Sequence, residues 1–168
     1  MLSDKDIKAL IDNKKLVIEP FAQKNLGYAS IDLALGNVFI KYKSLIDTQS
    51  NNISHELFSN SELILEPGQF VLGITREKIK IPNGYYGFIE TRGNFARAGI
   101  SVTCDDGHID PGTNGLITLE IKNNNNVRIK LYAGDLIGQL FLFKLSSNCS
   151  KTYGGKYMKQ NYPTIFKR

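Results

Sequence analysis

The sequence predicts one all-β domain with a single short helix at its N-terminus, folded as a β-barrel or jelly-roll. Short runs of β-branched and aromatic residues recur along the chain, and Gly, Pro or Asn separates each run from the next. Only the first dozen or so residues place apolar side chains at helical spacing. Because 168 residues and 42% hydrophobic content suit one compact core, we expect a single domain over residues 1–168.

The helix prediction depends on a capping pattern at its start. Ser3 is a good N-cap, and Asp6 follows three residues later as its capping-box partner. Ile7, Leu10 and Ile11 then give one apolar face. The helix is expected to end near residues 13–15.

The expected strands are bounded by turn residues such as Pro67-Gly68 and Pro82-Asn83-Gly84. They are 16–18, 30–35, 38–42, 63–65, 70–75, 78–81, 85–90, 116–121, 127–131 and 139–145, with another beginning at Ile100. The polar residues 44–61 are expected to form an exposed, mobile loop. Residues 146–168 lack a packing period and by themselves predict a disordered tail.

The strand over 116–121 follows a chain reversal at Ile109-Asp110-Pro111-Gly112. Side chains alternate along a strand, so Ile117, Leu119 and Ile121 are expected on one face and Leu116, Thr118 and Glu120 on the other. A carboxylate beside Leu116 is costly to bury unless the protein uses it there. The alternative is that this face is solvated.

Composition argues against several classes of protein. The net charge of +5 is spread along the chain, without a basic tract, zinc-finger spacing or RNA-binding aromatic signature, so no nucleic-acid partner is expected. No apolar run is long enough for a membrane span, and the N-terminus lacks a signal-peptide pattern, which favours a cytoplasmic protein without a membrane partner. Cys104 and Cys149 are expected to be free thiols.

The segment Thr91–Gly99 is suited to binding an anion. Arg92 and Arg97 flank Gly93-Asn94, and guanidinium groups with exposed backbone N–H groups match phosphate oxygens. The alternative is a short helix whose arginines form surface salt bridges.

Seven motifs occur in a fixed order along nearly the whole chain. They are MLSDKDI at the start, Ala29–Leu33, Pro67–Gly73, Arg92–Gly99, Ile109–Gly112 with Thr118–Glu120, Ile137–Leu140, and Tyr153–Tyr157. This series resembles the dCTP deaminase family, whose fold is shared with the trimeric dUTPases. The resemblance implies a homotrimer of distorted β-barrels of the dUTPase-like type, with an active site at each subunit interface. It also implies dCTP or dUTP as substrate, with Mg²⁺ bound through the triphosphate.

The resemblance further implies roles for individual residues. Glu120 would be the general acid/base for the water that attacks C4 of the pyrimidine, and Arg97 would orient that water and Glu120. Asp110 would bind the sugar and, in dUTPase members, prepare the hydrolytic water. Residues 146–168 would form a lid that the nucleotide orders. The implied nucleotide-binding residues are Arg92, Gly93, Asn94, Phe95, Ala96, Arg97, Asp110, Thr118, Leu119, Glu120, Gln139, Tyr153, Lys156 and Gln160.

A zinc-dependent deamination is not expected, because that chemistry needs a His or Cys together with a Cys-x-x-Cys pair. This chain has two cysteines 45 positions apart and two histidines. Water would instead be activated by a carboxylate in a low-dielectric pocket beside an arginine, and Glu120 with Arg97 is the pair that the resemblance provides. We expect no metal ligands from the protein.

Two positions depart from the family pattern. Most members have serine where Gly93 stands, and strictly deaminating members often have histidine where Gly107 stands. The leading interpretation is a dCTP deaminase, with or without further conversion to dUMP. The alternatives are a dUTPase on the same scaffold and a catalytically silent nucleotide-binding protein. A nucleic-acid-binding barrel is disfavoured, since no aromatic platform alternates with Lys or Arg. Asp105-Asp106 has no assigned role.

Overall fold

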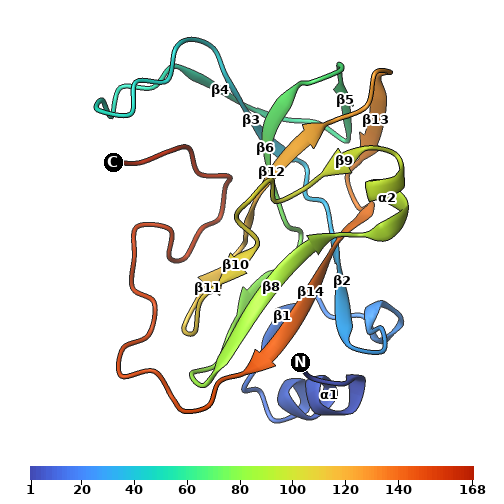
Figure 1. The fold of residues 1–168 in the computed structure, drawn as a ribbon, viewed down its shortest axis with the longest axis vertical. Helices are drawn as coiled ribbons and strands as arrows, with labels where there is room; N and C mark the ends of the chain where they lie inside the picture. The colour runs from blue at the N-terminus through green and yellow to red at the C-terminus, as the bar shows by residue number, and fades with distance from the viewer.

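The computed structural model describes residues 1–168 and consists mainly of antiparallel strands in four sheets (Figure 1). One sheet has the order β10 (His108–Ile109), β8 (Tyr85–Thr91), β14 (Leu136–Lys144), β2 (Ser30–Ala34). The largest has the order β4 (His55–Ser59), β3 (Val38–Tyr42), β6 (Phe70–Ile74), β12 (Thr118–Asn123), β9 (Ile100–Ser101). The smaller two are β1 (Val17–Glu19), β7 (Lys78–Lys80), β11 (Asn114–Gly115), and β13 (Ile129–Tyr132), β5 (Glu62–Leu65).

The all-β class is confirmed, but the expected barrel is not closed. The strands divide among four separate sheets instead of continuing around one cylinder. Many strands are only two to five residues long, and the register of β14 against β2 shifts between Leu136 and Gly138.

The N-terminal helix α1 (Asp4–Asp12) forms with the predicted cap. The Asp6 backbone N–H donates to Ser3 Oγ at 3.4 Å, and the Ser3 backbone N–H donates to Asp6 Oδ2 at 3.3 Å. Ile7 and Leu10 are buried, so the helix closes one end of the core.

The core contains 23 buried hydrophobic side chains drawn from every sheet. Leu119 and Ile121 of β12 are among them, with exposed fractions of 1% and 0%, as predicted for this face of the strand. Ile117, predicted on the same face, lies before β12 and is only partly buried. Within the same interior, Glu77 is also buried, and its Oε2 accepts a hydrogen bond from the Ala34 N–H at 2.9 Å. Burial raises the pKa of Glu77 above its ordinary value.

The prediction of an unbroken loop over residues 44–61 is wrong, because β4 lies inside it. β4 pairs with β3 along its full length, yet it is an edge strand with mostly exposed side chains. Only Phe58 packs inward, 5.6 Å between ring centroids from Phe39. An edge strand with polar side chains shows little of the alternation by which a strand is recognised.

A second helix, α2 (Gly93–Arg97), occupies the arginine segment, and a 3₁₀ turn, η1 (Gln23–Asn25), follows β1. The helix α2 matches the short helix that was the alternative to an anion-binding segment over residues 91–99.

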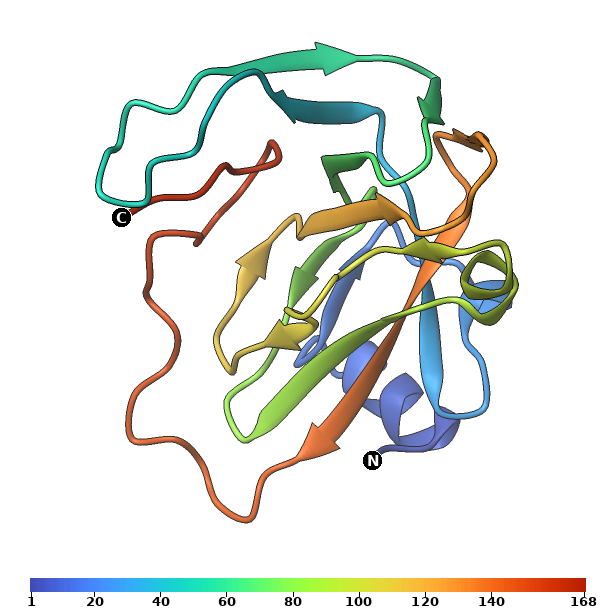
Figure 2. The ribbon, with the colours of Figure 1, turned by 45° about the horizontal axis from the view of Figure 1, so that its top comes forward.

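Residues 146–168 contain no helix or strand, yet they run along the side of the molecule (Figure 2). The chain ends beside the segment between β3 and β4, far from the N-terminus (Figures 1 and 2). No helix combines the length and apolarity that a membrane crossing requires.

Candidate active site

A cavity of about 660 Å³ lies between β12 and the C-terminal segment. Five of the predicted site residues line it: Asp110, Thr118, Glu120, Tyr153 and Gln160. The polar face of β12 therefore forms one wall of this cavity, as the alternation of side chains predicted. The solvated-face alternative does not describe Glu120, which is only partly exposed.

Several contacts fix the position of β12 and hence of Glu120. β12 pairs with β6 over five residues, from Thr118 opposite Ile74 to Lys122 opposite Phe70. Just before the strand, the Ile117 N–H donates to Thr75 Oγ1 at 2.9 Å, and the Thr75 hydroxyl donates to the Glu77 carbonyl at 2.8 Å. The Glu120 N–H donates to the Val102 carbonyl at 2.8 Å.

The electrostatic surroundings favour the protonated form of Glu120. Burial raises the pKa of Glu120 above its ordinary value, and the negative charges of Asp106 and Asp105 raise it further. A carboxyl group whose pKa is moved toward neutrality can both accept and return a proton at physiological pH.

The rim of the cavity includes Asp106 and His108, neither of which was assigned a role from the sequence. His108 Nδ1 lies 3.3 Å from Asp106 Oδ1, and its ring contacts Phe88 edge-on at 5.6 Å between centroids. The Asp105-Asp106 pair, unusual in the sequence, thus contributes negative charge beside Glu120.

A second group of predicted residues lies outside the cavity. The side chain of Asp32 connects Arg92 and Gln139: its Oδ2 is 3.0 Å from Arg92 Nε, and its Oδ1 accepts from Gln139 Nε2 at 3.0 Å. Asp32 sits in the recognised run Ala29–Leu33, but its role depends on strand pairing, because Gln139 of β14 lies opposite Asp32 of β2.

The residues of α2 are mostly at the surface. Gly93, Asn94, Ala96 and Arg97 are exposed, while Phe95 packs against the core. None of them lines the Glu120 cavity, and neither do Arg92 and Gln139. Within one chain the predicted site is therefore divided into an acidic cavity and a separate arginine-bearing corner.

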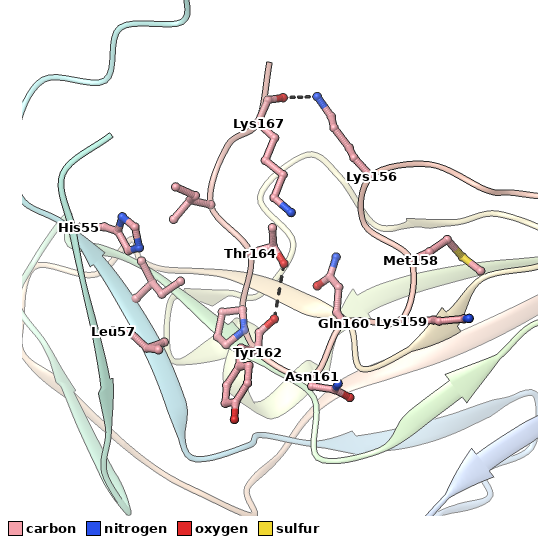
Figure 3. Close-up of a pocket in the computed structure, with 13 residues that line it drawn as sticks. His55, Leu57, Lys156, Met158, Lys159, Gln160, Asn161, Tyr162, Thr164 and Lys167 are labelled. Carbon is pink, nitrogen blue, oxygen red and sulfur yellow. Dashed lines mark hydrogen bonds between the residues drawn. The ribbon is translucent and has the colours of Figure 1, made fainter. Parts of the chain in front are cut away.

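Two further predicted residues have distinct surroundings. The Leu119 side chain is buried in the core, because it points to the opposite face of β12 from Glu120, and the residue does not line the cavity. Lys156 lines a neighbouring cavity of about 470 Å³ rather than the Glu120 cavity (Figure 3). Its ammonium group donates to the Lys167 carbonyl.

The side chains form no cluster of three or more His, Cys, Asp or Glu residues suited to holding a metal ion. Asp106 and Asp110 are nevertheless both in the wall of the Glu120 cavity. Mg²⁺ is commonly held by one or two carboxylates together with substrate phosphates, so these residues fit an ion that arrives with a triphosphate. Both cysteines are free thiols, as predicted.

Solved structures of other proteins define the type of fold. A 2′-deoxycytidine 5′-triphosphate deaminase from Agrobacterium tumefaciens superposes with a TM-score of 0.66 at 20% identity, over 84% of this chain and 46% of that chain. A Staphylococcus bacteriophage 80alpha dUTPase solved with dUpNHpp gives a TM-score of 0.54 at 14% identity, over 90% of this chain and 95% of that one. The fold is therefore of the dUTPase-like type.

Sequence comparison narrows this class to one family. Residues 1–145 match the family described as dCTP deaminase-like. A relative from Dictyoglomus turgidum named "dCTP deaminase, dUMP-forming" is 38% identical, over 99% of this chain and 94% of the relative. A relative of the same name from Coprothermobacter proteolyticus is also 38% identical, over 97% and 93%. The chain belongs to the dCTP deaminase-like family.

Proposed function

We propose that the protein is a zinc-independent dCTP deaminase that continues to dUMP. It would convert dCTP and water to dUTP and ammonia, and then dUTP and water to dUMP and pyrophosphate. The observation that carries the proposal is Glu120, a partly buried carboxyl group with a raised pKa in the wall of a cavity of nucleotide size. Near-full-length relatives named as dUMP-forming dCTP deaminases support the same reaction.

In the deamination step, the Glu120 carboxylate would take a proton from the water that attacks C4 of cytosine. A C–O bond forms at C4, the C–N bond breaks, and the proton leaves with ammonia. Asp110, in the wall of the same cavity, would hold the sugar and prepare the water that attacks the phosphate chain in the second step. Mg²⁺ bound to the triphosphate would offset its negative charge.

Conversion to dUMP is favoured by the position of Gly107. A side chain there would place its Cβ 2.4 Å from the Ile89 carbonyl oxygen and 3.2 Å from the Phe88 ring. The histidine that strictly deaminating members often have at this position would not fit this backbone. The local packing thus supports a dUMP-forming site.

The division of the site supports a homotrimer with interfacial active sites. Arg92, Arg97 and Gln139 lie outside the cavity that contains Glu120, so we infer that a neighbouring copy brings its arginine-bearing corner to each cavity. The guanidinium of Arg97 would then orient water and Glu120, while Arg92 and the exposed backbone N–H groups of α2 would bind phosphates.

The test is to incubate the protein and Mg²⁺ with dCTP or dUTP separately and to identify the products over time. We expect dUMP, pyrophosphate and ammonia from dCTP, and dUMP and pyrophosphate from dUTP. Cleavage of dUTP with dCTP left intact would identify a dUTPase instead. Binding of both nucleotides without turnover would identify a silent nucleotide-binding protein.

The matched variant is Glu120→Gln, which keeps the shape of the side chain and removes its proton-accepting group. We expect turnover of dCTP to fall by about 10²- to 10⁴-fold, with nucleotide affinity nearly unchanged. Turnover within a few-fold of the parent protein would contradict the role assigned to Glu120.

A further inference from the structure

The turn that follows β12 holds the C-terminal end of α2. The helix α2 connects β8 to β9, and Ala98 is its C-terminal cap (Figure 1). The last carbonyl groups of a helix have no partners within the helix itself. Here the Asn125 side chain supplies one partner, because its Nδ2 donates to the Ala98 carbonyl at 3.0 Å. The Asn124 N–H donates to the next carbonyl, that of Gly99, at 2.8 Å.

The backbone that leaves α2 is also in direct contact with the turn. Gly99 follows the cap with a φ of +85°, a conformation that glycine adopts readily. A Cβ at this position would lie 2.9 Å from Asn125 Cβ and 3.2 Å from the Asn125 nitrogen. A side chain there would force the two segments apart, so the end of α2 is seated directly on Asn125.

The turn is itself fixed from the interior. Asn123, the last residue of β12, has no exposed surface. Its Nδ2 donates to the Leu65 carbonyl at 3.0 Å and to the Val127 carbonyl at 2.9 Å. Its Oδ1 accepts from the Asn125 N–H at 2.9 Å. A buried amide with three partners is costly to displace, so the core holds the backbone of Asn125 in place.

The two ends of α2 are held by different parts of the molecule. At the N-terminal end, the Arg92 side chain meets Asp32 of β2, and the Arg92 N–H donates to the Ile137 carbonyl at 2.8 Å. At the C-terminal end, the amide of Asn125 donates one residue beyond Arg97. Arg97 is exposed, and its side chain makes no hydrogen bond or ion pair in the structure. The position of its guanidinium therefore depends on the backbone of the last turn of α2.

We propose that Asn125 is a positioning residue for Arg97. Asn125 does not line the Glu120 cavity, so it acts through α2, whose last turn it fixes. In a trimer with interfacial sites, one strand would then serve two sites: β12 carries Glu120 to its own cavity, and the turn at its end holds Arg97 for the cavity of a neighbouring copy. The consequence for turnover rests on the proposed function, whereas the attachment of α2 to the turn does not.

Three variants of the turn separate the contact from its surroundings. Asn125→Asp keeps the shape of the side chain and the oxygen that accepts from the Asn126 N–H. It replaces the donor to Ala98 with a negative charge beside the end of a helix, where negative charge is unfavourable. Asn125→Ala removes the donor without adding charge. Asn126→Asp is the matched control, because it makes the same change one position later, on an exposed side chain without a hydrogen bond.

Amide hydrogen exchange measured by NMR tests the attachment without any nucleotide. The Gly99 N–H closes the last turn by donating to the Ala96 carbonyl at 3.0 Å, whereas the Phe95 N–H donates to the Arg92 carbonyl at 2.9 Å in the first turn. Asn125→Asp should speed exchange at Gly99 roughly tenfold and leave Phe95 unchanged, and Asn125→Ala should act in the same direction. Both amides are far from position 125 in the sequence, so the substitutions do not alter their intrinsic exchange rates.

Turnover supplies a readout that a general loss of stability would not produce. Arg97 is proposed to orient the water that attacks C4, so Asn125→Asp should lower kcat for ammonia release from dCTP about tenfold. The KM for dCTP and the release of pyrophosphate from dUTP should stay within about twofold of the parent, because the Arg92 end of α2 keeps its own contacts. Asn126→Asp should match the parent in every measurement.

Three results would overturn the proposal. The first is exchange at Gly99 in Asn125→Asp that matches the parent and Asn126→Asp. The second is faster exchange at Gly99 with an unchanged kcat for dCTP. The third is an equal loss of dCTP and dUTP turnover, which would reject a role specific to Arg97. If the parent protein deaminates no dCTP, the proposed function fails, while exchange at Gly99 still decides whether Asn125 holds α2.

Discussion

Replacing Thr75 with valine tests how firmly the interior holds the strand that carries Glu120. The Thr75 side chain has no exposed surface, and its hydroxyl both accepts from the Ile117 N–H and donates to the Glu77 carbonyl. Valine keeps the size of the side chain but leaves one donor and one acceptor without partners. Each unsatisfied buried group costs about 1–3 kcal/mol, so we expect Thr75→Val, which leaves two, to lower the free energy of unfolding by about 2–6 kcal/mol.

Urea denaturation at a fixed protein concentration measures this loss, because the stability of the proposed homotrimer would depend on concentration. Thr75→Ser should recover most of the stability, since it keeps the hydroxyl. Thr48→Val is the matched control, because Thr48 is exposed and its hydroxyl has no hydrogen-bond partner in the structure. A Thr75→Val protein as stable as Thr48→Val would refute the argument.

Three further predictions address the site itself. Mixing subunits of Glu120→Gln and Arg97→Ala, each inactive alone, should restore roughly a quarter of parental dCTP turnover, because about one site in four would combine an intact Glu120 with an intact Arg97 from the neighbouring chain. No recovery in verified mixed oligomers would contradict interfacial sites. Asp106→Asn should lower the pKa of Glu120 by removing a nearby negative charge, and so shift the acidic limb of the kcat/KM profile to lower pH. An acidic limb at the parental pH would show that the charge of Asp106 does not affect the pKa of Glu120. Gly93→Ser should raise dCTP turnover relative to dUTP turnover by roughly tenfold, because a hydroxyl could bind phosphate or water. The backbone tolerates this change, since Gly93 lies in α2 without a positive φ and its Cβ would approach only the movable Arg97 guanidinium, at 3.2 Å; an unchanged substrate ratio in the folded oligomer would make the missing hydroxyl irrelevant.

Local patterns in the sequence were sufficient for the helix and for the orientation of β12. The capping box at Ser3 and Asp6 and the alternation around Glu120 each involve neighbouring residues, so one stretch contains the whole signal. β4 was not predicted, because its signal does not lie within one stretch of the sequence. Its side chains face solvent, and its place in the fold is determined by pairing with β3, which a local pattern does not record.

The arrangement of the site required tertiary information. Asp32 meets Gln139, 107 residues later, only because β2 and β14 are adjacent. Likewise, no periodicity in residues 146–168 indicates that the tail follows the stretch 111–118, because backbone groups make most of those contacts. The family motifs supplied the candidate residues and implied an interfacial site, but they did not indicate which of those residues lie together within one chain.

The buried carboxyl group of Glu77 makes folding a proton-binding reaction. Its pKa in the folded protein lies above the ordinary value of 4.5, so the native state retains a proton that the unfolded chain would release. Between those two pKa values, unfolding releases protons to the solvent. The contribution of Glu77 to stability is therefore present in acid and is lost as the pH rises through its folded-state pKa, which is opposite to the behaviour of a carboxylate held in a salt bridge.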